Sequence, residues 1–94
     1  MYKCLKINFS AAEIPDNFLR TYIQKKANQL KLEGTAQMVK ADHAIKIIVY
    51  GLKESVDDFV DFLHKRPGNT MLEDLEVEPF IKERDYRGAF RIIE

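Results

Sequence analysis

The sequence has a single cysteine and no excess of charge of either sign, and both absences exclude classes of protein. Cys4 cannot form an intrachain disulfide, so the chain is not a disulfide-stapled secreted scaffold and a cytoplasmic location is expected. Fifteen Lys and Arg residues balance fifteen Asp and Glu residues. Because nucleic-acid-binding domains usually carry a basic excess, no nucleic-acid partner is expected.

Long apolar runs and metal-ligand patterns are also missing. Lys3 and Lys6 interrupt the first segment, and no stretch approaches the roughly 20 apolar residues of a membrane helix, so neither a signal peptide nor membrane association is predicted. His43 and His64 have no partner at metal-ligand spacing, so no metal and no other cofactor is expected. The 94 residues suffice for one domain, residues 1–94, which we expect to be monomeric.

Hydrophobic periodicity is what the sequence does contain. Alternating apolar residues predict strands over 2–9, 35–41, 44–50, 72–82 and 89–93, with a hairpin turn at Asp42 and His43. Apolar stripes at helical spacing predict helices over 18–31 and 53–65. Apart from the short final strand over 89–93, the elements follow the order βαββαβ, which predicts an α+β, ferredoxin-like sandwich in which two helices cover one face of a four-stranded antiparallel sheet.

Several residues stand at the spacings of one known family. The first predicted helix and the segment after it contain Phe18-Leu19-Arg20, Ala27, Leu30 and Gly34. The second helix and the last strands contain Gly51, Val56, Phe59, Phe62, Leu63, Leu75-Glu76-Val77 and Ala89-Phe90-Arg91-Ile92. This pattern resembles the acylphosphatases. The resemblance implies an enzyme that hydrolyses carboxyl–phosphate bonds, with a small acyl phosphate or phosphate as its partner and no cofactor.

The resemblance also implies where the site lies. Arg20 aligns with the family's phosphate-binding arginine, whose planar fork matches two phosphate oxygens. The family's phosphate loop corresponds to Ala12, Glu13, Ile14, Pro15, Asp16, Asn17, Phe18 and Leu19. The family's water-holding asparagine lies four residues after a glycine that corresponds to Gly34, which places Met38 at that position.

Four of these positions depart from the family pattern. Ala12 and Asp16 replace glycines, and Pro15 has no N–H to offer a phosphate. The thioether of Met38 is only a weak acceptor and cannot hold a water as an amide does. Gln37 would replace the amide only if a bulge turned it to the other face of the strand.

The sequence therefore predicts an acylphosphatase-like protein whose hydrolytic activity is weak or lost, and it leaves open whether any catalysis survives. The alternative is a non-catalytic module that binds a ligand or a protein on the same fold. RNA recognition is less favoured, because the Lys/Arg-Gly-aromatic signature of RNA-recognition domains is absent from the sequence.

Overall fold

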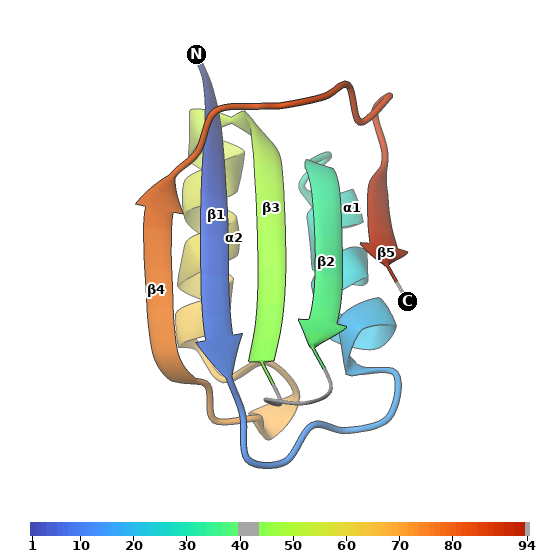
Figure 1. The fold of residues 1–94 in the computed structure, drawn as a ribbon, viewed down its shortest axis with the longest axis vertical. Helices are drawn as coiled ribbons and strands as arrows, with labels where there is room; N and C mark the ends of the chain where they lie inside the picture. Colours follow the sequence, from blue (N-terminus) through green and yellow to red (C-terminus); the bar gives the residue numbers. More distant parts are fainter. Residues whose placement is uncertain (40–43, 94) are drawn as a thin grey trace.

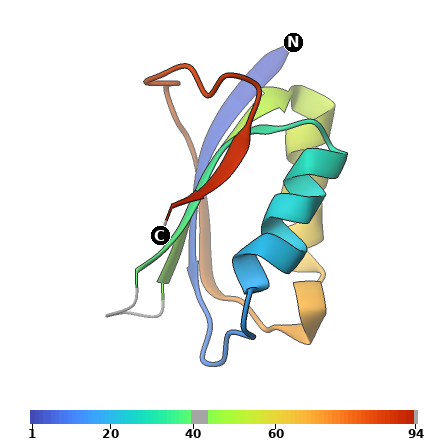
Figure 2. The ribbon, with the colours of Figure 1, turned by 90° about the vertical axis from the view of Figure 1, so that its right-hand side faces the viewer.

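The protein consists of a five-stranded sheet that is covered on one face by helices (Figures 1 and 2). The structure is a computed structural model and describes residues 1–39 and 44–93. The strands lie in the order β4-β1-β3-β2-β5. Their bounds are β1 (Tyr2–Ser10), β2 (Glu33–Val39), β3 (Ala44–Leu52), β4 (Glu73–Pro79) and β5 (Phe90–Ile93). The helices are η1 (Leu19–Gln24), α1 (Lys25–Gln29), α2 (Lys53–His64) and the short η2 (Pro67–Asn69). The predicted ferredoxin-like α+β fold is confirmed.

The core lies between the sheet and the two helices, and period-2 alternation places the strand residues in it. On β3, Ile45, Ile47 and Val49 face the helices with no exposed surface, whereas Lys46 points to the open face. The helices contribute stripes at helical spacing, Leu19, Ile23 and Ala27 from the first and Val56, Phe59 and Leu63 from the second. The two stripes predicted from the sequence therefore form the core.

The first helix differs in detail from the continuous helix predicted over residues 18–31. Leu19–Gln24 winds as a π-helix and only Lys25–Gln29 is α-helical. Single π turns are rare and are often found at functional sites. Here the wider turn begins at Leu19, the last residue that the resemblance aligns with the family's phosphate loop.

The last strand corrects the prediction of a four-stranded antiparallel sheet. The sheet in the structure has five strands and is mixed. β5 pairs in parallel with β2, with Phe90 opposite Gly34. Pro79 ends β4, and the next residue still contacts β1, where the Phe80 N–H donates to the carbonyl of Cys4 at 3.1 Å. The following segment stays at that end of the sheet and crosses to the other edge, where the Gly34 N–H donates to the carbonyl of Ala89 at 3.0 Å (Figure 1). β5 therefore starts beside the start of β2 and runs in the same direction.

Gly34 is required where β2 meets β3. Its φ of +142° disfavours any side chain, and a Cβ there would overlap the carbonyl oxygen of Ile48. The predicted turn at Asp42 and His43 lies outside the described residues.

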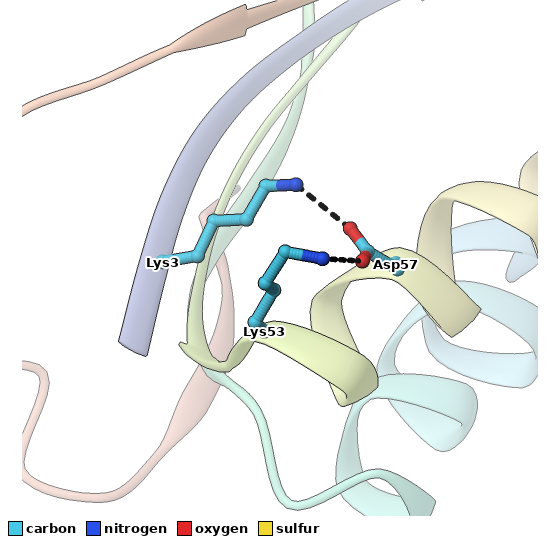
Figure 3. Close-up of polar contacts among 3 residues, drawn as sticks. All are labelled: Lys3, Lys53 and Asp57. Atoms are coloured by element: carbon cyan, nitrogen blue, oxygen red, sulfur yellow. Dashed lines mark hydrogen bonds and ion pairs between the residues drawn. The ribbon is translucent and has the colours of Figure 1, made fainter. Parts of the chain in front are cut away.

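An ion-pair cluster ties the start of β1 to α2, at the end of the sheet where β1 begins (Figure 3). The Nζ of Lys3 lies 2.7 Å from Oδ1 of Asp57, and the Nζ of Lys53 lies 2.9 Å from Oδ2. Hydrogen bonds from both lysines lower the pKa of the Asp57 carboxyl below its usual value. Asp57 is therefore ionised at neutral pH and joins two elements that are distant in sequence.

Candidate active site

A cleft lies beside the loop that connects β1 to the first helix, next to the end of β2. Its volume is about 620 Å³. The lining residues are Ala12, Ile14, Pro15, Asp16, Asn17, Phe18, Leu19, Arg20, Met38, Ile92 and Ile93. All the site residues predicted from the sequence are thus brought together except Glu13. That residue lines a separate cleft of about 540 Å³ on the other side of the loop, beside Gly68 and Asn69.

The loop closes on itself just before the helix. The Phe18 N–H donates to the carbonyl of Pro15 at 3.1 Å, which makes a tight turn with Asp16 and Asn17 at its centre. Asn17 has a φ of +60°, a left-handed conformation that asparagine tolerates better than most residues. The turn itself uses the Phe18 N–H, and Pro15 has no N–H, so two backbone donors of the predicted loop are not available to an anion.

Arg20 and Asp16 bring opposite charges to the same cleft. Arg20 lies in the first turn of η1, and both side chains are exposed. An arginine at a cleft wall can bind an anion through its two parallel N–H groups. A carboxylate on the same wall repels that anion, so the cleft combines one group that suits phosphate with one that opposes it.

Met38 lies on the helix-facing side of β2, opposite the buried Ile45 of β3, and is half-buried against the core. Gln37 lies on the open face, opposite Lys46, and is exposed. The pairing of β2 with β3 runs in register from Glu33 to Val39. No bulge interrupts that described stretch, so Gln37 is not turned toward the cleft.

Ile92 and Ile93 are cleft residues that the sequence did not reveal. They lie on β5, where Ile92 pairs with Ala36 and Ile93 with Gln37. Only the parallel pairing of β5 with β2 brings them beside Met38, and no motif in the sequence signals that pairing. Like Ile14 and Met38, these residues add apolar side chains to the lining of the cleft.

Cys4 and His64 do not line this cleft. Within residues 1–39 and 44–93, no three His, Cys, Asp or Glu side chains gather closely enough to hold a metal ion. Cys4 lies half-buried on β1. Burial raises the pKa of its thiol, an effect that the nearby Lys82 only partly offsets. The thiol therefore stays protonated at neutral pH and is a poor nucleophile.

Comparison with known proteins decides the family. The family model for acylphosphatase matches residues 17–92. The chain belongs to the acylphosphatase family. An acylphosphatase of Caldivirga maquilingensis is 25% identical over 69 residues, which cover 73% of this chain and 73% of the relative.

Two solved acylphosphatase structures have the same fold. The one from Coxiella burnetii superposes with a TM-score of 0.82 at 21% identity, covering 98% of this chain and 93% of that one. The one from Bacillus subtilis superposes with a TM-score of 0.82 at 17% identity, covering all of both chains. No described helix is both long and apolar enough to cross a membrane.

The extent of the family match divides the cleft in two. The match to acylphosphatase begins at Asn17, so Arg20 and Met38 lie inside it. The preceding loop residues, Ala12 to Asp16, lie outside it.

Proposed function

We propose that this acylphosphatase-family protein retains a phosphate-binding arginine, Arg20, but hydrolyses carboxyl–phosphate bonds weakly or not at all. The observation that carries the proposal is the composition of the cleft. Arg20 shares it with Pro15, Asp16 and Met38. Each of these three residues opposes one requirement of the family's reaction.

Phosphate binding is the first requirement. A phosphate needs convergent backbone N–H groups. Pro15 supplies none, and the Phe18 N–H is used by the turn. The Asp16 carboxylate adds repulsion of roughly 1 kcal/mol in bulk water, or roughly 4 kcal/mol at a surface dielectric, for one charge pair about 4 Å apart. Arg20 therefore binds phosphate with little help from the loop.

Water activation is the second requirement. Attack on an acyl phosphate needs a water held close to the reacting phosphorus, which an amide side chain can do by donating and accepting hydrogen bonds. Met38 stands at the position that the family resemblance assigns to this amide. Gln37 lies on the other face of β2. Without an amide at position 38, the water is not oriented there and hydrolysis slows.

The proposal extends to the setting of the protein. We infer one monomeric, cytoplasmic domain whose partner is a small acyl phosphate or phosphate rather than a nucleic acid. The single cysteine and the equal numbers of acidic and basic residues support these inferences.

A second candidate is a binding module that holds a ligand in the same cleft without turning it over. The apolar lining residues Ile14, Met38 and Ile92 favour this function, because an apolar surface in the same cleft as a cation suits an organic anion. The two candidates differ in turnover, so one assay separates them.

The test is hydrolysis of benzoyl phosphate by the wild type and by Arg20→Ala, with Arg66→Ala as a matched control. Arg66 is an exposed arginine that does not line the cleft. We expect the three proteins to differ by less than about twofold in rate, and the combined variant Pro15→Gln, Asp16→Gly, Met38→Asn to gain turnover. Wild-type turnover that Arg20→Ala abolishes and Arg66→Ala preserves would overturn the claim of lost catalysis.

A titration with inorganic phosphate, followed by NMR, tests binding separately. Shifts at the amides of Asp16 to Thr21 are expected in the wild type and not in Arg20→Ala. The same shifts in both proteins would remove Arg20 from the binding site.

A further inference from the structure

A third cleft, which no part of the proposed function uses, lies at the end of the sheet where β2 and β5 begin (Figure 1). Its volume is about 260 Å³. We refer to it as the arginine cleft, and its lining residues are Arg84, Asp85, Tyr86, Arg87 and Arg91. Figure 1 places the loop that joins β1 to the first helix at the opposite end of the sheet. The arginine cleft is therefore separate from the candidate active site.

The backbone of this cleft is held by hydrogen bonds to its own turn and to β2. The Ala89 N–H donates to the carbonyl of Tyr86 at 3.0 Å. The Arg87 N–H donates to Oδ1 of Asp85 at 2.8 Å, and the Gly88 N–H donates to Oε1 of Glu33 at 3.3 Å. Arg91 is fixed separately, because it lies in the pairing of β5 with β2. The backbone positions of Arg87 and Arg91 are thus set by two different parts of the fold.

The charges around the cleft are unbalanced. Among the described residues that line it, Asp85 alone carries a carboxylate, and the Glu33 carboxylate lies beside it, so three guanidinium groups face two acidic groups. Each of these carboxylates already accepts a hydrogen bond from the turn. Among the residues that the structure describes, none of the three guanidinium groups forms an ion pair with a carboxylate.

The local excess of positive charge does not follow from composition, because the whole chain has a net charge of zero. Arg84 lies over the ring of the buried Tyr86, with its Cζ 5.7 Å from the ring centroid. This cation–π contact keeps the Arg84 guanidinium beside the Tyr86 ring. Three arginines therefore line a space several times larger than the roughly 30 Å³ that a water molecule takes up in the liquid.

We propose that the arginine cleft binds a phosphate group, either inorganic phosphate or the phosphate of a small phosphomonoester. A guanidinium fork binds two oxygens of one anion. A carboxylate has only two oxygens and one charge, which one arginine satisfies. A phosphate has three or four oxygens and close to two charges at neutral pH, so it can engage more than one of the three arginines.

The experiment is an NMR titration of the full chain at constant ionic strength, with inorganic phosphate, phenyl phosphate and acetate as probes. Saturable shifts are expected at the amides of Tyr86 to Arg91 with a phosphate probe and not with acetate. Tighter binding of phenyl phosphate would assign the site to phosphomonoesters, and equal binding would assign it to inorganic phosphate. Equal shifts with acetate and phosphate would overturn the proposal, because they would show general screening of charge.

Variants separate this site from the candidate active site. Arg87→Gln and Arg91→Gln are each expected to weaken phosphate binding here by about tenfold or more, since hydrogen bonds to charged groups are worth at least that much. Arg66→Gln, which removes the same charge from an exposed position outside the cleft, is expected to leave the affinity unchanged. Wild-type affinity in both Arg87→Gln and Arg91→Gln would refute the site. Shifts confined to Asp16 to Thr21 would also refute it, while leaving phosphate binding by Arg20 in place.

Discussion

Replacing Asp16 by Asn tests the proposed site most directly, because the Asp16 carboxylate lines the cleft in which phosphate is proposed to bind. Asn has almost the same shape as Asp and also favours turns, so Asp16→Asn removes the charge and keeps the loop. Like charges about 4 Å apart repel by roughly 1 kcal/mol in water and by roughly 4 kcal/mol at a surface dielectric. Because Asp16 is exposed, the lower value applies. About 1 kcal/mol corresponds to an affinity gain of roughly fivefold.

The assay is the phosphate dissociation constant from NMR shifts at Asn17 to Thr21, measured at two ionic strengths. The gain in affinity is expected to be present at about 0.01 M salt and nearly absent at about 1 M salt. The reason is that the Debye length is roughly 30 Å at the lower salt concentration and roughly 3 Å at the higher one. Asp61→Asn, an exposed carboxylate of α2 outside the cleft, is the matched control. A gain of the same size in Asp61→Asn, or no gain in Asp16→Asn at low salt, would refute the reasoning.

Three further predictions concern the scaffold. Phe59→Ala removes a fully buried ring and is expected to lower the free energy of unfolding by about 3–5 kcal/mol, measured by urea denaturation; a loss below about 1 kcal/mol would contradict its place in the core. Gly34→Ala is expected to prevent folding, as judged by circular dichroism, because a Cβ there overlaps a β3 carbonyl. Gly88→Ala, with open space around it, should cost only about 1–2 kcal/mol of left-handed strain. The folded-state pKa of Asp57 is lowered, so its contribution to stability is present above the unfolded pKa and is lost as the pH falls through the folded value. Acid titrations of Asp57→Asn should therefore show a smaller loss of stability below about pH 4 than those of the wild type.

The sequence predicted those parts of the fold that depend on periodicity. The alternation of Ile45, Ile47 and Val49 identified β3, and the spacing of Val56, Phe59 and Leu63 identified α2 with its buried face. Both patterns arise because one side of each element faces the same core. Local periodicity was sufficient for these elements.

The direction of β5 could not be obtained in the same way. A four-residue strand has the same alternation whether its neighbour runs parallel or antiparallel to it. Its direction depends on the path from Pro79 to Ala89, which has no periodic signal. For the same reason the sequence did not predict that Ile92 and Ile93 line the cleft beside Met38.

Within the candidate site, the family resemblance supplied the positions, and the structure added the conformations. The resemblance named Arg20 and Met38, and both line one cleft. The hydrogen bond from the Phe18 N–H to the carbonyl of Pro15 closes a turn in which Asn17 has a left-handed backbone conformation. Many residues adopt several backbone conformations in a loop, so this turn was not evident from the residue types alone.

The positions of β4 and β5 also determine how the sheet can assemble. β1, β2 and β3 come from residues 2–52, whereas both outer strands come from residues 73–93. Leu5 must therefore find Pro79, and Gly34 must find Phe90. Contacts between such distant residues form slowly, and until they form both edges of the three-stranded sheet have unpaired N–H and C=O groups. The refolding yield is therefore expected to fall as the protein concentration rises, because partly folded chains can pair through these two edges.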